Sequence, residues 1–300
     1  MNRLKGILMI IIGAMFWGAT GPMMEYMLSK TNMTAEFMLS VRLLIAGPLL
    51  LLLLSIQKQN IWAIWQQSIW RNQLLIFSVV GMLGLQFTFV KSIEASNAVV
   101  ATLLQFLAPI FIIFYVALIH KKWPPNKQLI GIIGTLFGLF LLLTNGSLST
   151  LLVSNEALIW GLFLGLTYAF YTLYPARMMA EWGVLVVVAW GMLLSGSVLA
   201  VTGRIWLSND WSLLVHPPIF WMMVALVILG ASAFVLFLSS MKYISAVETS
   251  VLSSFEPLTA MIISVFWFGS VMQSWQLLGM LLMLVFVAYL SIAGEKGGKA

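Results

Sequence analysis

Ten apolar runs, each close to the length that crosses a bilayer, alternate with short polar connections along this chain. A helix of about 20 consecutive apolar residues spans the hydrocarbon layer, so each run predicts a transmembrane helix. The connections are too short to form a separate domain. The predicted spans cover residues 7–28, 34–55, 73–91, 97–119, 128–145, 157–177, 183–203, 218–241, 246–268 and 274–293.

The basic residues orient these spans, because cytoplasmic connections of membrane proteins carry an excess of Lys and Arg. With ten spans and both termini in the cytoplasm, the inner side holds most of the basic residues and Arg42 lies within the second span. The inner residues are Arg3, Lys5, Lys58, Arg71, Lys121, Lys122, Lys127, Arg177, Lys242, Lys296 and Lys299, and the outer ones are Lys30, Lys91 and Arg204. We therefore predict a multi-pass protein of the cell (plasma or inner) membrane with both termini cytoplasmic.

The composition agrees with a chain that is surrounded by lipid. Hydrophobic residues make up 62% of it and charged residues only 8%, whereas soluble domains carry about 25% charged residues. The net charge of +6 does not indicate nucleic-acid binding, because the basic residues lie singly between apolar runs. The chain has no cysteine and no HExxH, GxSxG or glycine-rich phosphate motif, so we expect no metal, no cofactor and no enzymatic activity.

Two halves of the chain are related by a shift of 148 residues. Any one coincidence is weak in an apolar chain, but a constant offset across several spans predicts an internal repeat. The matched pairs are Gly13 and Gly161, Ala98 and Ala246, Leu104 and Leu252, Pro109 and Pro257, Gln128 and Gln276, and Gly131 and Gly279. Residues 1–146 and 147–300 then hold five spans each, and an odd number of spans inverts the second half relative to the first.

Several of these features resemble the EamA family of the drug/metabolite transporter superfamily. They are Phe16-Trp17-Gly18 in the first span, Arg42 in the second, and "MKYISAVETSVLSSFEP" before Pro257. Within that family, "IFSVVG" and "AFYTLYP" are similar to the YicL-like branch. The resemblance implies an all-α polytopic membrane protein in which two inverted five-helix repeats surround a central cavity. It also implies alternating-access transport, mostly export, of small metabolites such as amino acids.

One departure from the family limits what can be transferred. Family members often carry a glutamate at the ends of spans four and nine. Here those places hold Ile119-His120-Lys121 and Phe268-Gly269-Ser270, so no role of those glutamates applies to this chain.

Glu256 is the main candidate for a functional residue. It lies near the middle of the ninth predicted span, where an acidic residue costs about 2.5–3.5 kcal/mol and should face protein or water. Pro257 cannot donate a backbone hydrogen bond, so we expect it to bend the helix and free the Ser253 carbonyl. The hydroxyls of Ser253 and Ser254 would then join the carboxylate in one polar locus. A substrate or proton-coupling role and a buried structural acid remain alternatives, and the alanine at the matching position, Ala108, favours the first.

The other candidates also have structural alternatives. Gln105, one turn before Pro109, either faces the cavity or makes an interhelical hydrogen bond. Arg42 either pairs with Glu25 or contacts a substrate carboxylate. Four further side chains could line a cavity or simply pack: Trp17, Tyr168 and Tyr171, with Gln86 as a weaker candidate.

We predict a secondary transporter for a small-molecule substrate, with protons as a candidate coupling ion. An importer in the same fold and a non-transporting membrane scaffold or sensor are the alternatives. The identity of the substrate and the oligomeric state are left open by these patterns.

Overall fold

A computed structural model describes residues 2–121, 123–147, 151–244, 249, 252–269 and 271–297. Within these ranges the secondary structure is helical, with no strand. Its elements are α1 (Asn2–Lys30), α2 (Ala35–Ile56), η1 (Ala63–Trp65), α3 (Ser68–Ile76), η2 (Phe77–Leu83), α4 (Gly84–Ala95), α5 (Ala98–Gln105), α6 (Ala108–His120), α7 (Asn126–Thr144), α8 (Asn155–Leu173), α9 (Ala176–Trp182), α10 (Val184–Thr202), η3 (Ile205–Leu207), η4 (Asn209–Val215), α11 (Pro217–Ser240), α13 (Phe255–Phe268) and α14 (Ser274–Gly297).

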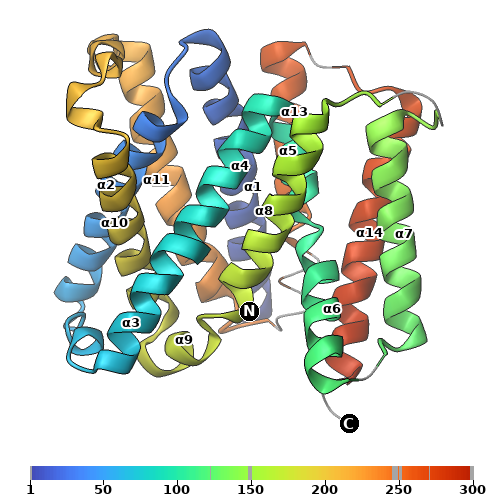
Figure 1. Ribbon diagram of the computed structural model, residues 1–300, viewed down its shortest axis with the longest axis horizontal. Coiled ribbons are helices and arrows are strands. Elements are labelled where there is room, and N and C mark those ends of the chain that lie inside the picture. Colours follow the sequence, from blue (N-terminus) through green and yellow to red (C-terminus); the bar gives the residue numbers. More distant parts are fainter. Residues whose placement is uncertain are drawn as a thin grey trace.

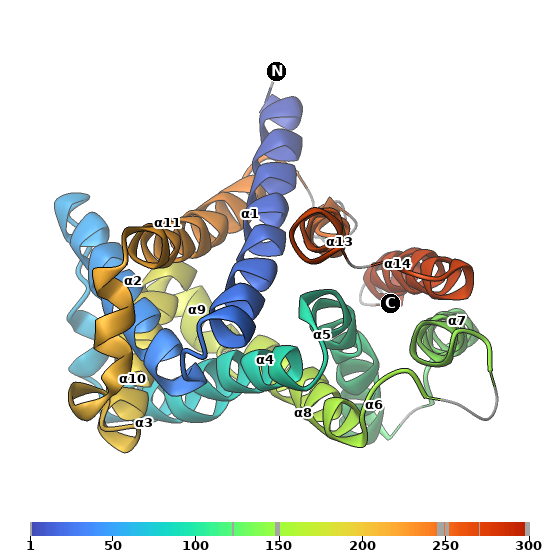
Figure 2. The same ribbon diagram turned by 90° about the horizontal axis from the view of Figure 1, so that it is seen from above.

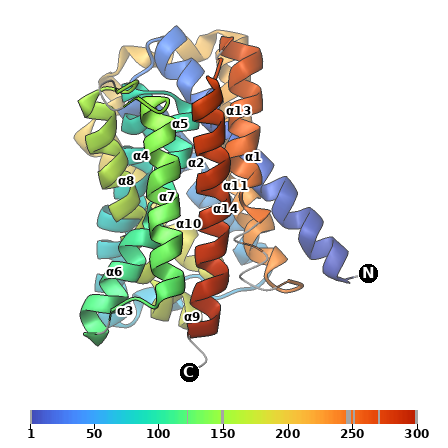
Figure 3. The same ribbon diagram turned by 90° about the vertical axis from the view of Figure 1, so that its right-hand side faces the viewer.

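The long helices run side by side as one bundle, and α1 begins at the same end at which α14 finishes (Figures 1 and 3). Among the described residues, eight helical segments are long and apolar enough to cross a membrane. Two shorter apolar helices, Phe255–Phe268 and Ser274–Leu290, accompany them. The chain is therefore a polytopic helical membrane protein. The ninth predicted span, 246–268, lies partly outside the described residues.

Helices from the two halves of the sequence pair with one another throughout the bundle. The main partners are α2 with α10, α4 with α8, α7 with α14, and α1 with both α11 and α13. In Figure 2, α7 and α14 form a separate pair at one edge. Two glycines allow their close approach, since a Cβ on Gly138 would lie 2.7 Å from the Gly279 carbonyl oxygen. The remaining helices surround the interior that is described below.

The fourth predicted span is interrupted rather than continuous. Helix α5 ends at Gln105 and α6 begins at Ala108. The amides of Phe106 and Leu107 donate to the carbonyls three residues back, at 3.1 and 3.0 Å, so the backbone tightens there. Pro109 then occupies the first turn of α6, where a missing N–H leaves no bond unmade.

The ninth span is interrupted in a similar way, one turn before its proline. Ser253 and Ser254 form a turn, and Pro257 lies in the first turn of α13. Our expectation of a freed Ser253 carbonyl is wrong, because this oxygen accepts a hydrogen bond of 2.9 Å from the Glu256 amide. The tightened turn satisfies the carbonyl that the proline leaves without a donor.

The third span contains a segment that the sequence pattern did not predict. Residues Phe77–Leu83 form a π-helix that connects α3 to α4 without a break. The three segments together form one span from Ser68 to Ala95. A π-helix has hydrogen bonds between residues five positions apart, is rare, and is frequently found at functional sites. The Ser195 hydroxyl of α10 donates to the Ser78 carbonyl at 2.6 Å and supports this irregular backbone.

Candidate functional site

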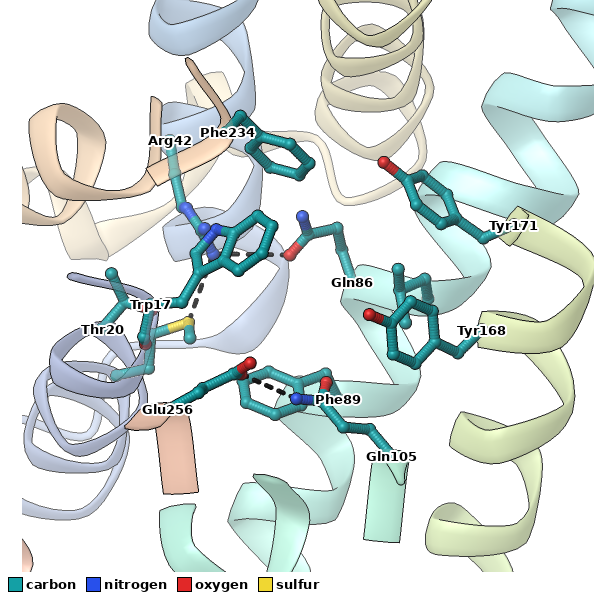
Figure 4. A pocket seen from close by; sticks show the side chains of 12 residues that line it. Trp17, Thr20, Arg42, Gln86, Phe89, Gln105, Tyr168, Tyr171, Phe234 and Glu256 are labelled. Atoms are coloured by element: carbon teal, nitrogen blue, oxygen red, sulfur yellow. Dashed lines mark hydrogen bonds between the residues drawn. The ribbon is translucent and has the colours of Figure 1, made fainter. Parts of the chain in front are cut away.

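A cavity lies between the two halves of the chain, with about 580 Å³ of space between atoms that includes open solvent (Figure 4). Helices α1, α2, α4, α5, α8, α11 and α13 contribute its walls. Its lining residues are Trp17, Thr20, Met24, Arg42, Leu85, Gln86, Phe89, Gln105, Tyr168, Tyr171, Phe234 and Glu256. Seven of the nine predicted substrate or coupling residues therefore line the same cavity. The exceptions are Ser253 and Ser254.

Glu256 and Gln105 join the two interrupted spans at this cavity. Gln105 is the last residue of α5, and its Nε2 donates to Oε1 of Glu256 at 2.7 Å. Glu256 is in the first turn of α13, where the unpaired amides and the helix dipole favour a carboxylate. Both predicted alternatives for Gln105 thus hold at once, since it faces the cavity and bonds across helices.

A glycine on α1 brings this helix very close to the backbone of Glu256. A Cβ on Gly18 would overlap the Glu256 carbonyl oxygen and lie 2.8 Å from the Cβ of Thr259. Any larger residue at position 18 would push α1 away from the start of α13. Trp17, next in sequence, lines the cavity beside this contact.

Arg42 supplies the second charge at the cavity, and its predicted pair with Glu25 does not form. Its side chain is 5% exposed. Nη1 donates to Oε1 of Gln86 at 3.4 Å and lies 3.5 Å from Sδ of Met24. Glu25 instead accepts a 2.8 Å hydrogen bond from the amide of Ala98, the first residue of α5. Helix N-terminal amides lack intrahelical acceptors and attract carboxylates, which is why Glu25 turns to α5.

Aromatic rings separate and enclose the polar groups. Trp17 packs edge-on against Phe234, with ring centroids 4.8 Å apart. The ring centroids of Tyr168 and Tyr171 on α8 are 6.2 Å apart, and the Tyr171 ring also packs against Phe77 of the π-helix. Phe234 was not predicted from the sequence, because a phenylalanine in an apolar run looks the same whether it packs or lines a cavity.

A second and wider cavity continues from the first, with about 1410 Å³ of space between atoms that includes open solvent. The two share Trp17, Gln105, Tyr168, Tyr171, Phe234 and Glu256 in their walls. The wider one reaches Met179 of α9, Val184 at the start of α10 and Met241 after α11. These elements meet at the end of the bundle at which α1 begins (Figure 1). The interior space therefore widens towards that end.

The remaining predicted residues divide between lining and support. Ser253 and Pro109 line the wider cavity. Ser254 precedes α13 and makes no side-chain capping bond. Pro257 is buried in the first turn of α13. The expected polar locus thus consists of Glu256, Gln105 and Ser253 rather than of the serine pair and a free carbonyl.

Sequence comparison adds the decisive observation to this geometry. The pattern of the EamA-like transporter family matches twice, over residues 4–144 and 155–292. The chain belongs to this family. EamA-like proteins are membrane transporters, and transport of a small molecule across a bilayer is what the membership indicates for this chain.

Two relatives and one solved structure extend the comparison. The uncharacterized inner membrane transporter YicL of Salmonella typhimurium is 34% identical over 99% of this chain and 98% of its own. The uncharacterized transporter YwfM of Bacillus subtilis is 27% identical over 96% of this chain and 94% of its own. A solved crystal structure shares the fold with a TM-score of 0.63 at 15% identity, covering 96% of both chains.

Proposed function

We propose that this EamA-like protein is a secondary transporter that exports small polar or amphipathic metabolites, such as amino acids, by alternating access. The observation that carries the proposal is the bond between Gln105 and Glu256. It joins two interrupted spans, one from each half of the chain, at a cavity that both halves line. Discontinuous helices that meet at a central site are typical of secondary transporters with inverted repeats.

The proposed repeats are residues 1–146 and 147–300. The cross-half pairing of helices supports this division, because each half buries its helices against the other. Interruptions before Pro109 and Pro257, which are 148 residues apart, support it further. Rocking of one half against the other around the cavity would then alternate its access.

We propose that the end of the bundle with the start of α1 faces the cytoplasm. The excess of basic residues on that side supports this orientation. The cavity widens towards the same end, which supports assigning an inward-facing state within the proposed mechanism. At the opposite end, the bond from the Ala98 amide to Glu25 holds α1 against α5, and it would have to break when that end opens.

Glu256 is the proposed coupling group. Its carboxylate has one protein donor among the described residues, Gln105, and faces the cavity with the rest of its hydrogen-bonding capacity. It can therefore take a proton or the amine of a substrate. Trp17 and Tyr168 beside it would shield the bound group from water and supply ring faces to a cation.

Counterflow in proteoliposomes tests the proposal. Vesicles loaded with unlabelled metabolites from an amino-acid panel should transiently accumulate external labelled metabolite of the same kind. A carrier exchanges solutes, whereas a channel lets them leak and a scaffold moves none. A pure leak, or no movement of any member of a broad metabolite panel, would refute the proposal.

A further inference from the structure

Arg42 is a buried cation whose neighbours leave its charge uncompensated. The residues around it in the described structure are neutral: Gln86, Met24 and the backbone of Gly230. The contacts to Gln86 and Met24 are long, at 3.4 and 3.5 Å, whereas charge-assisted hydrogen bonds of arginine are typically about 2.7–2.9 Å. Glu25, the acidic residue of α1, accepts a hydrogen bond from the Ala98 amide instead.

Gly230 of α11 makes the room in which the guanidinium lies. A Cβ at this position would stand 2.9 Å from Nη2 of Arg42 and 3.4 Å from Nε. An alanine at position 230 would therefore displace the guanidinium group of Arg42 without removing its positive charge. The glycine sets the position of the guanidinium at the wall of the cavity that Figure 4 shows.

We propose that Arg42, positioned by Gly230 and flanked by Gln86, is the subsite that binds a carboxylate of the transported solute. The planar guanidinium matches a carboxylate in a bidentate geometry, and a monoanion would replace the long contacts with short charge-assisted ones. A phosphate dianion fits less well, because the cavity holds a single cationic side chain among its lining residues and also contains Glu256. The inference rests on the proposed transport function and narrows its substrates to solutes with one carboxylate.

The location of this subsite relative to Glu256 adds a selection rule. Arg42 and Gln86 lie on one side of the cavity, and Glu256 and Gln105 on another (Figure 4). A solute with a carboxylate at one end and a hydrogen-bond donor at the other can occupy both. A solute with two carboxylates would place one of them against Glu256 and should be rejected.

The test is a binding experiment on purified protein with matched probes. Small aliphatic and aromatic monocarboxylates, each paired with its carboxamide, and inorganic phosphate are titrated while the thermal unfolding midpoint is followed. We expect at least one carboxylate to stabilise the protein while its amide does so only at about 10- to 100-fold higher concentration, as expected for a hydrogen bond to a charged group. Arg42→Gln should remove this preference, and Arg42→Lys should restore only part of it.

Gly230→Ala distinguishes a specific effect on carboxylate binding from a general loss of folding. It should weaken carboxylate binding about tenfold while the amide titration stays unchanged. Gly13→Ala is the matched control, since its Cβ would meet the same helix α11 at 3.3 Å from the Ala233 carbonyl oxygen, away from Arg42. Equal binding of every carboxylate and its amide, stronger stabilisation by phosphate, or an unchanged preference in Gly230→Ala would each overturn the subsite.

The two proposals can fail separately. A carboxylate preference without counterflow would refute transport and leave the subsite standing. Counterflow by a protein that binds carboxylates and their amides equally well would support transport and refute the subsite.

Discussion

Replacing Glu256 by glutamine changes one oxygen into an NH₂ group and removes the charge at the junction of the two interrupted spans. The bond to Gln105 at 2.7 Å can still form, because the new side chain keeps a carbonyl oxygen. It changes from charge-assisted to neutral, which lowers its contribution from about 1.5–3 to about 0.5–1.5 kcal/mol. The stability of the folded protein should therefore fall by only about 1 kcal/mol.

Transport should respond far more than stability. A glutamine cannot exchange protons or neutralise an amine, so Glu256→Gln should fold yet lose proton-driven accumulation and its dependence on pH. Any counterflow that persists in the variant should proceed at the same rate with and without a pH gradient. The assay compares uptake into proteoliposomes with and without such a gradient, alongside thermal unfolding in detergent.

A matched substitution controls for the loss of one negative charge. Glu94→Gln removes an exposed carboxylate that pairs with Lys91 at 2.7 Å, a kind of bond worth about 0–1 kcal/mol. It should leave accumulation and its pH profile unchanged. Wild-type accumulation and pH dependence in Glu256→Gln would refute the coupling role and make Glu256 a structural acid.

Three further predictions concern the topology, the partners of Arg42 and the packing of α1. Reporter fusions after Ala293 should indicate cytoplasm and fusions within 146–155 the outside; a cytoplasmic signal from 146–155 would contradict the inverted topology. Glu25→Ala should not restore the folded yield that Arg42→Ala lowers, because Glu25 bonds to α5 instead of Arg42; recovery of the yield in the double variant would show a pair after all. Gly18→Val should destabilise the protein by about 1–3 kcal/mol through overpacking against α13, and an unchanged unfolding midpoint would argue against this contact.

The apolar spans, and the expectation that Glu256 faces the protein interior, could be derived from the sequence because both depend on local quantities. An apolar run of membrane length has few alternatives to a helix, since lipid offers no partner for backbone groups. A carboxylate in the middle of such a run, Glu256, must face protein or water for the same reason. Pro257 predicted that regular helix would fail in the ninth span, and the described helix is interrupted one turn before it. These arguments need only the residues within one span.

Partner choice, in contrast, was decided by the tertiary structure. Gln105 and Glu256 are 151 positions apart, so nothing local indicates their bond. A pair of Arg42 with Glu25 was one of two alternatives that the sequence left open, and it does not form because the amide at the start of α5 takes the carboxylate. The space that Gly230 leaves for Arg42 depends on how α11 approaches α2. Apolar composition sets how many helices there are, whereas close packing between distant segments sets which polar groups meet.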